Sequence, residues 1–424
     1  MGLNKLLMVA YHFPPLAGSS GIQRTLRFVQ HLPTHQWQPI VLTADSGAYE
    51  RVSDDLMRDI PGDVHVCRAL ALDTARHLAI GGRYLGWMAR PDRWMSWRFD
   101  AVRRGLRLIR DLRPTALWST YPIATAHLIG AELQRRSGLP WIADFRDPMA
   151  QPGYPADPAT HNSFVQIERL AARQAALCVF ATPGALRDYQ QRYPEAAPRM
   201  RLLENGYDEA SFTEAEASPD LGRPLNPGRL TILHSGIVYP EERDPRPLFD
   251  ALAALLTNGA LQRGTLRLRF RAPVHDGLLR QLAEQRGIGE LIEILPQAPY
   301  REALTEMLRA DALLVLQSDD CNDQVPAKLY EYLRAARPVL CLADPAGDTA
   351  RTCLGAGLPD IAPLEDAEAI ASRLLGLIEA IHRGTAPHPS PAAIRSASRQ
   401  SRSAQLAGWL DVVAGGSSLV QSRA

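Results

Sequence analysis

Asp323-Gln-Val-Pro-Ala-Lys-Leu-Tyr-Glu-Tyr-Leu333 is the stretch of sequence that decides the fold. It follows the apolar run 312–317, which is typical of a buried parallel strand. Pro326 stands where a helix favours its first residue, and Lys328 and Glu331 share one face of that helix. Ligands of open α/β sheets bind outside the carboxyl ends of the strands. We therefore predict a crevice in which the helix N-terminus and Lys328 meet phosphate oxygens and Glu331 meets sugar hydroxyls, a site for a sugar nucleotide.

Strand-like and helix-like segments alternate along most of the chain, which is typical of doubly wound α/β domains. We predict strands near 5–10, 39–43, 64–67, 115–119, 140–144, 177–181, 200–203, 230–235, 265–271, 291–295, 312–317 and 338–343. We predict helices near 22–32, 122–136, 163–175, 183–193, 245–257, 275–286, 300–309, 326–335 and 365–382. A polar, proline-rich passage over 211–229 interrupts the alternation and is typical of a linker. The fold class is therefore α/β, with two Rossmann-like domains facing a cleft.

Composition excludes several classes of function. The 424 residues suffice for two domains, and the net charge of +1 gives no bulk attraction to nucleic acid. The five cysteines lack metal-type spacing, which favours reduced thiols, a cytoplasmic location and no bound metal or cofactor. No stretch approaches the roughly 20 apolar residues of a membrane span, and the first apolar run is too short for a signal peptide. A soluble or peripheral protein is expected.

The stretch 323–333 resembles the donor-site motif of family 4 glycosyltransferases, which have the GT-B fold. Their signature is two glutamates with seven residues between them; here Glu331 is the second and Asp323 replaces the first. The closest likeness is a bacterial polysaccharide sub-group with Lys-Leu-Tyr-Glu-Tyr before a buried Pro-Val-Leu strand, as at 328–332 and 338–340. The resemblance implies a nucleoside-diphosphate sugar donor in the second domain, an acceptor in the first, retention of configuration and no metal. It also implies that a final helix returns to the first domain.

On this basis we expect five parts. They are an acceptor-side domain over 1–210, a linker over 211–229, a nucleotide-sugar-binding domain over 230–390, a returning helix over 391–413 and a disordered tail over 414–424.

Two motifs of the first domain carry candidate chemistry. The loop 11–21 follows the first strand, resembles the Tyr-x-Phe-Pro-Pro…Gly loop of the sub-group, and ends at Gly21, where backbone amides approach a bound group. The loop also holds His12, a further candidate. Asp144, Arg146 and Asp147 lie at the end of the strand near 140–144 and resemble its Asp-x-Arg-Asp-Pro box. These carboxylates are candidates for positioning acceptor hydroxyls or removing a proton. A structural arginine–aspartate pair that anchors the loop is the alternative.

His127 is the remaining catalytic candidate of the first domain. Many family 4 enzymes have a histidine closer to the strand end, where this chain has Ser119-Thr120-Tyr121. His127 lies further into the following helix, so a satisfied helix histidine is the alternative.

Gly236 and Arg243 complete the predicted donor set. They resemble a glycine turn and basic residue that hold the donor diphosphate, for which an arginine fork is suited. Arg246 is the second choice, and surface pairing of both arginines with Glu241 and Glu242 is the alternative.

The segment 83–113 combines tryptophans, among them Trp94 and Trp97, with many arginines. That composition fits contact with an anionic membrane at the inner face of the cell membrane, and an ordinary solvated helix face is the alternative.

We expect a metal-independent hexosyltransferase-type enzyme that moves a sugar to a glycan or lipid-linked acceptor in cell-surface polysaccharide biosynthesis. The alternatives are a sugar-nucleotide epimerase or hydrolase and a non-catalytic GT-B scaffold subunit. No motif specifies the sugar, the base, the acceptor, the linkage or the oligomeric state.

Overall fold

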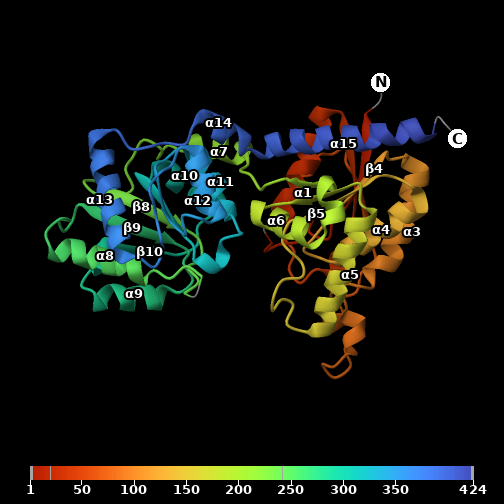
Figure 1. The fold of residues 1–424 in the computed structure, drawn as a ribbon, viewed down its shortest axis with the longest axis horizontal. Coiled ribbons are helices and arrows are strands. Elements are labelled where there is room, and N and C mark those ends of the chain that lie inside the picture. The colour runs from red at the N-terminus through yellow and green to blue at the C-terminus, as the bar shows by residue number, and fades with distance from the viewer. Residues whose placement is uncertain (1–2, 20, 241, 422–424) are drawn as a thin grey trace. The chain divides into compact units, whose positions relative to one another are not determined.

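The computed structural model describes residues 3–19, 21–240 and 242–421, and the chain divides into two compact units. Unit 1 comprises Met1–Glu204 and Arg399–Ala424, and unit 2 comprises Asn205–Ser398. The red and the deep blue ends of the ribbon in Figure 1 both belong to unit 1. Unit 2 is thus inserted between two segments of unit 1.

Unit 1 is built on a seven-stranded parallel sheet in the order β3-β2-β1-β4-β5-β6-β7. From β1 the chain winds outward to β3, then returns beside β1 and winds the other way, which is the doubly wound arrangement predicted from the sequence. The strands are β1 (Asn4–Val9), β2 (Trp37–Ala44), β3 (His65–Ala69), β4 (Ala116–Thr120), β5 (Trp141–Phe145), β6 (Leu177–Phe180) and β7 (Met200–Leu202).

Helices cover both faces of this sheet (Figure 1). Leu7 and Val9 of β1 belong to one core cluster and Leu6 and Met8 to another, because successive side chains of a strand point to opposite faces. The helices are α1 (Gly21–His31), α2 (Thr74–His77), α3 (Trp97–Leu112), α4 (Thr125–Ser137), α5 (Pro158–Gln174), α6 (Pro183–Arg192) and α15 (Arg399–Gln421).

Helix α15 packs on unit 1 beside α1. Leu406 and Leu410 are fully buried in the same cluster as Leu6 and Met8. The indole Nε1 of Trp37 donates a 2.8 Å hydrogen bond to Asp411 Oδ1. The last helix therefore supplies part of the core of the first unit.

Unit 2 is built on a six-stranded parallel sheet in the order β10-β9-β8-β11-β12-β13. Its strands are β8 (Leu230–Ser235), β9 (Leu266–Arg271), β10 (Ile292–Leu295), β11 (Ala312–Leu316), β12 (Val339–Leu342) and β13 (Ile361–Ala362). Its helices are α7 (Glu209–Glu216), α8 (Arg246–Thr257), α9 (Asp276–Gln285), α10 (Tyr300–Arg309), α11 (Ala327–Ala335), α12 (Asp348–Ala356), α13 (Ala367–Arg383) and α14 (Pro391–Ser396).

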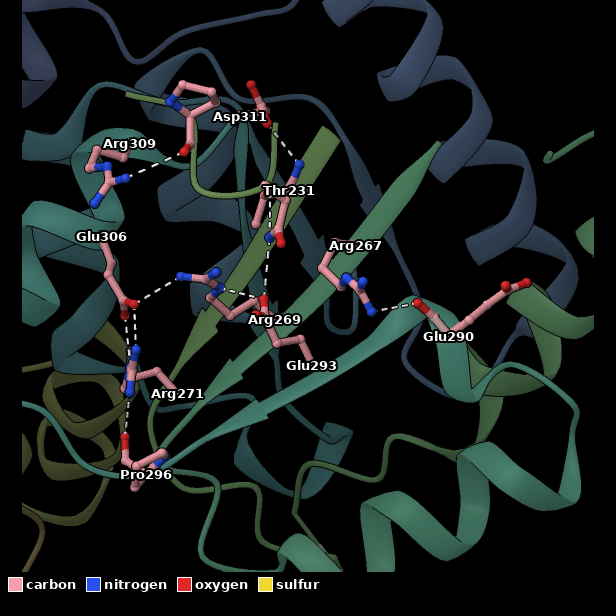
Figure 2. Close-up of polar contacts among 12 residues, drawn as sticks. Thr231, Arg267, Arg269, Arg271, Glu290, Glu293, Pro296, Glu306, Arg309 and Asp311 are labelled. Carbon is pink, nitrogen blue, oxygen red and sulfur yellow. Dashed lines mark hydrogen bonds and ion pairs between the residues drawn. The ribbon is translucent and has the colours of Figure 1, made fainter. Parts of the chain in front are cut away.

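An ion-pair network lies along β9 and joins it to β10 and α10 (Figure 2). Arg269 donates through Nε to Glu293 Oε2 at 2.6 Å and through Nη1 to Glu306 Oε1 at 3.0 Å. Arg271 pairs with the same Glu306 and donates through Nη1 to the Pro296 carbonyl at 2.7 Å. Because every charge here has partners, the network holds α10 against the sheet rather than offering a free cation.

Three boundaries differ from the predicted ones. The passage 211–229 was predicted to be a linker, but α7 occupies its first residues and the unit boundary lies after Glu204. The predicted helix over 391–413 is two helices, and only α15 joins unit 1. The tail over 414–424 was predicted to be disordered, yet α15 continues to Gln421, because extending an existing helix is far easier than starting one. Residues 422–424 lie outside the described residues.

The segment 83–113 also differs from its prediction as a tryptophan-bearing membrane contact. Trp97 is fully buried and Trp94 packs partly buried on the unit 1 core, so neither is placed to enter a membrane. Of the helices in the described part of the chain, none is long and apolar enough to cross a membrane.

Candidate functional site

The candidate donor site lies where the winding of the unit 2 sheet reverses. From β8 the chain runs outward through β9 and β10, and β11 then returns on the other side of β8. The carboxyl ends of β8 and β11 therefore border the switch point, where open α/β sheets bind ligands. A pocket of about 210 Å³ is found there. Its lining is His234, Arg243, Leu314, Val315, Leu316, Pro326, Ala327, Lys328, Leu329 and Tyr332.

Gly236 makes room for Lys328 at this pocket. Gly236 follows β8 with φ +137°, a conformation that side-chain-bearing residues rarely adopt. A Cβ on it would stand 2.7 Å from Lys328 Cε, so only glycine lets the lysine side chain cross here without a shift. The ammonium is thereby held over the loop that follows β8.

Arg243 and Lys328 share the pocket. Among the described residues, no aspartate or glutamate lines it. Burial lowers the pKa of Lys328, the positive charge of Arg243 lowers it further, and Glu331 raises it. Arg243 is held by an Nη1 donation to the Ile237 carbonyl at 2.7 Å, and its guanidinium lies 5.2 Å from the centre of the Tyr239 ring. Two fixed cations that repel each other beside a helix N-terminus form a site for a polyanion.

Arg246, the second choice, is directed elsewhere. Its Nε donates to Asp244 Oδ1 at 2.9 Å, and it does not line the pocket. Within the described part of the chain, Glu242 forms no ion pair with either arginine, and its carbonyl accepts from Ser318 N at 2.8 Å. Glu241 lies outside the described residues.

Glu331 and Asp323 stand at the edge of the site rather than in the pocket lining. Glu331 Oε1 accepts a 2.8 Å hydrogen bond from the Tyr300 hydroxyl, which orients the carboxylate one turn along α11 from Lys328. Asp323 lies exposed in the loop between β11 and α11. Of the predicted donor-binding residues, Gly236, Arg243 and Lys328 come together, with Glu331 beside them and Asp323 further out, whereas Gly21 belongs to unit 1.

The loop before α11 is fixed by residues that sequence reasoning missed. The side-chain amide of Gln317 donates to the carbonyls of Cys321 and Gln324, and Thr349 Oγ1 donates to Gln317 Oε1 at 2.6 Å. His234 is a further missed lining residue, and its Nδ1 lies 3.0 Å from the Leu314 carbonyl. Burial lowers the pKa of His234 to about 4, so the imidazole is neutral at pH 7. The only sequence signal for His234 is its position two residues before Gly236 of the predicted glycine turn.

In unit 1, the loops that follow β1 and β5 meet at Gly21. A Cβ on Gly21 would stand 2.1 Å from Arg146 Nη1 and 2.5 Å from His12 Nδ1, so the glycine admits both side chains. His12 Nδ1 lies 2.9 Å from Ser19 Oγ, which also accepts from Gly21 N at 3.2 Å. Burial and the charge of Arg146 lower the pKa of His12 to about 4. Asp147 is exposed, with its Oδ2 3.6 Å from Arg146 Nε.

Asp144 is not placed for catalysis. Its carboxylate is fully buried and receives two 2.8 Å hydrogen bonds from Arg24, together with one of 3.0 Å from Thr120 Oγ1. Arg24 also donates to the Leu203 carbonyl at 2.8 Å. The predicted alternative, a structural arginine–aspartate pair, therefore describes Asp144, but its partner is Arg24 of α1 rather than Arg146.

His127 is not placed for catalysis either. It is fully buried in α4, with Nδ1 2.8 Å from Ser119 Oγ and its ring against Phe145. Burial alone lowers its pKa to about 3, so it stays neutral over the physiological range. This is the structural helix histidine that the sequence left open, with Nδ1 hydrogen-bonded and Nε2 buried without a partner.

The fold is that of the GT-B glycosyltransferases, as its likeness to solved structures shows. HepE from Anabaena, solved in complex with UDP, matches with a TM-score of 0.59 at 13% identity, over 99% of this chain and 100% of that one. A glycosyltransferase from Rickettsia africae matches with a TM-score of 0.66 at 11% identity, over 97% and 99%. A trehalose 6-phosphate synthase from Burkholderia multivorans matches with a TM-score of 0.65 at 14% identity, over 99% and 98%. At such identities the likeness shows the fold alone.

Residues 20–206 match the family model described as a glycosyl transferase 4-like domain. The match covers most of the first segment of unit 1 and agrees with the family 4 resemblance read from the motifs. No curated protein matches the sequence. Residues 20–206 are therefore similar to a glycosyl transferase 4-like domain, and the chain has the GT-B fold.

Proposed function

We propose that the protein is a glycosyltransferase whose unit 2 binds a nucleoside-diphosphate sugar. The observation that carries the proposal is the convergence of Arg243, Lys328 and the first turn of α11 on one pocket at the switch point. A donor diphosphate would lie between the two cations and relieve their repulsion. The pocket volume of about 210 Å³ is below the ~300–1,000 Å³ of typical ligand sites, so it fits part of such a donor, and the rest would lie outside.

The chemistry of this site is stabilisation of a leaving group. As the bond to the sugar breaks, negative charge grows on the diphosphate, and Arg243 and Lys328 would neutralise it from fixed positions. Glu331, oriented by Tyr300, would accept hydrogen bonds from sugar hydroxyls. The motif resemblance supports retention of configuration and independence from metal. It also supports a role in cell-surface polysaccharide biosynthesis with a glycan or lipid-linked acceptor. The transfer would take place on the cytoplasmic side of the membrane.

The donor is identified by thermal shift against UDP-, GDP-, dTDP- and ADP-sugars without added metal. A ligand at about one hundred times its dissociation constant stabilises the native state by about 2.7 kcal/mol. Among the structural neighbours, HepE was solved with UDP-glucose, so UDP-sugars come first. Stabilisation by one nucleotide supports the proposal, and no shift with any donor contradicts it.

Arg243 and Arg246 provide a matched pair of variants. Arg243 lies in the loop after β8 and Arg246 is the first residue of α8, but only Arg243 lines the pocket, while Arg246 pairs with Asp244. We expect Arg243→Ala to weaken donor binding by about tenfold or more through the lost charge-assisted bonds, and Arg246→Ala to leave it unchanged. Lys328→Ala and Glu331→Ala should abolish transfer and leave the fold intact. Equal losses in both arginine variants would show that general charge, not this pocket, binds the donor.

A non-catalytic GT-B subunit is the second candidate function. The observation in its favour is that Asp144 and His127, two of the four predicted catalytic residues, are buried and hydrogen-bonded within the fold. A scaffold of this kind would bind the sugar nucleotide without turnover. The test is the release of free nucleotide from the stabilising donor, measured with and without a glycan acceptor mixture. A transferase should release nucleotide when acceptor is present, whereas a non-catalytic subunit should release none.

We also propose that unit 1 contacts an anionic membrane, through residues other than the predicted tryptophans. Ile80, Leu85 and Trp87 are 88%, 62% and 67% exposed. Ile80 and Arg83 close a tight hairpin over two glycines with positive φ, so exposed Ile80 stands at its base. No acidic residue occurs between 74 and 91, whereas exposed arginines do, as is typical of interfacial segments.

Vesicle co-sedimentation tests this contact. The full chain should bind phosphatidylglycerol vesicles, with binding that weakens as salt is added. Leu85→Ser/Trp87→Ser should reduce binding by about tenfold or more, since each buried apolar side chain contributes about 1.5–3 kcal/mol. Val274→Ser, at an apolar side chain of unit 2 that is 66% exposed, is the control. Absence of binding to anionic vesicles, or equal loss in the control, would exclude the proposal.

A further inference from the structure

A second cavity, in unit 1, shares no residue with the donor pocket. It measures about 860 Å³, belongs entirely to unit 1 and lies between α5, α6 and the turn Pro194–Arg199. Its lining is Ala150, Gln151, Pro152, His161, Val165, Arg169, Ala172, Arg173, Arg192, Tyr193, Pro194, Glu195, Ala196 and Arg199. We call it the arginine pocket. No predicted site residue belongs to it.

Arg169 and Arg173 give the arginine pocket an uncompensated positive charge. They stand one turn apart on α5, so their side chains project from the same face. Both are exposed, and neither forms an ion pair or hydrogen bond with any residue in the described part of the chain. Glu195 is the carboxylate of the lining. Two neighbouring guanidinium groups match the oxygens of a phosphate, which arginine binds in bidentate fashion.

The other two arginines belong to the walls. Arg199 donates to the carbonyls of Ala172 and Ala175 at the C-terminus of α5, where a cation is favoured. Arg192 pairs with Glu168 and lies over the Tyr189 ring at 4.3 Å. These contacts fix the pocket in shape without consuming the charge of Arg169 and Arg173.

Buried Glu168 makes the wall rigid. Its carboxylate accepts from the Ala150 amide at 2.8 Å and from the hydroxyls of Tyr189 and Tyr193 at 2.5 and 2.8 Å. It thereby joins α5, α6 and the loop after β5, three elements that border the cavity. A pocket held open in this way needs little reorganisation to accept a ligand.

Apolar surface fills the space between the charges. Val165, Ala172, Tyr193 and Ala196 line the cavity together with two prolines. A free phosphate would leave this apolar surface exposed to water, whereas a ligand with an apolar portion would bury it. The lining thus combines the features required by an amphiphile.

We propose that the arginine pocket binds a phosphorylated amphiphile, with a phosphate or diphosphate ester on Arg169 and Arg173 and an apolar chain against Val165, Tyr193 and Ala196. The proposal concerns a second ligand site on unit 1 and holds whether or not unit 2 binds a sugar nucleotide. If the protein is a transferase, such a ligand has the chemistry of a lipid-phosphate-linked acceptor.

Titration of the purified full chain with soluble prenyl phosphates tests the proposal. Farnesyl phosphate should bind more tightly than geranyl phosphate, by up to about fourfold for each methylene that becomes buried. Inorganic phosphate supplies the charge alone, and farnesol supplies the chain alone. Both should bind at least about tenfold more weakly than farnesyl phosphate, because each loses one half of the interaction.

Arg169→Ala/Arg173→Ala should weaken farnesyl phosphate binding by about tenfold or more. Alanine preserves helix α5, since both positions are exposed. Arg135→Ala/Arg136→Ala, on the exposed face of α4, removes the same charge from the same unit and is the control. The pocket variant should keep the thermal shift given by the sugar nucleotide, which separates this test from that of the donor site.

Three results would overturn the proposal. They are an equal loss of affinity in the control variant, binding of inorganic phosphate as tight as that of farnesyl phosphate, and binding of farnesol as tight as that of farnesyl phosphate. The first would indicate nonspecific charge, the second a simple anion site and the third a simple apolar groove.

Discussion

Single residues decide whether the donor pocket of unit 2 can form, and Gly236 is the most constrained of them. We expect Gly236→Ala to cost about 1–3 kcal/mol of stability through its positive φ and to lower donor affinity by displacing Lys328. Gly228→Ala is the control, because Gly228 has φ +79° with nothing within 4 Å of the added Cβ. Thermal unfolding with and without the donor measures both effects. Equal donor affinity in the two variants would contradict the role of Gly236.

Arg24 and Asp144 provide a test of a buried pair at the same scale. Removing one partner leaves the other charge buried and uncompensated, so Arg24→Ala should destabilise unit 1 by about 3–5 kcal/mol. All seven tryptophans belong to unit 1, so tryptophan fluorescence during urea unfolding follows that unit. If the carboxylate were catalytic instead, Asp144→Asn would lose turnover at unchanged stability.

Two buried histidines, His127 and His234, and the half-buried His12 make stability depend on pH. Burial lowers the pKa of His127 to about 3 and is the main cause that lowers those of His12 and His234 to about 4. As the pH falls below ~6.5, the unfolded chain binds protons that the folded chain excludes, so stability falls. Each histidine contributes about 1.4 kcal/mol per pH unit until its folded pKa is reached. His127→Gln should flatten the slope between pH 4 and 6 for unit 1 by about that amount; an unchanged slope would contradict the burial of His127.

Residue types at strand ends were predictable, whereas their partners were not. Lys328 was selected because loops after parallel strands gather at one edge of a sheet, and Gly236 and Arg243 were selected because they resemble a family 4 glycine turn and basic residue. The partnership of Arg24 with Asp144 joins residues 120 positions apart, and no local pattern signals it. The same holds for Gln317 and Thr349. Sequence reasoning therefore named polar residues near a site but did not separate an exposed carboxylate from a buried one.

At the scale of elements, α15 offers the clearest test of packing. Leu410 is fully buried beside α1, whereas Val412 on the same helix is 72% exposed. We expect Leu410→Ala to destabilise unit 1 by about 2–5 kcal/mol and Val412→Ala to change it by less than about 0.5 kcal/mol. Tryptophan fluorescence in urea measures both. Similar effects of the two variants would mean that α15 does not belong to the core.

Strands were predicted better than helices. All twelve predicted strands are present within a few residues of their predicted bounds, because most of them form continuous apolar runs and β9 alternates apolar and polar residues. The missed strand, β13, has only two residues. Helix α3 belongs to the arginine-rich segment 83–113 and agrees with the alternative given for it, a solvated helix face, with a buried face that begins at Trp97. Composition alone did not reveal which tryptophan faced inward.

At the scale of the whole molecule, unit 2 should fold on its own. Its sheet is complete within residues 205–398, and its two core clusters use only its own residues. We expect a fragment 205–398 to unfold cooperatively and to be stabilised by the same nucleotide as the full chain. Circular dichroism melting with and without nucleotide measures this. A fragment that folds but ignores the nucleotide would place donor binding elsewhere.

The insertion of unit 2 between two segments of unit 1 fixes an order of events during synthesis. Residues 205–398 leave the ribosome before α15 does, so the second sheet can be finished while the first still lacks the helix that covers Leu6 and Met8. Unit 1 is therefore the first to be synthesised but the last to complete its fold. A stalled or shortened product would carry a finished second unit and a first unit with exposed apolar surface, which is the form that chaperones and proteases would meet.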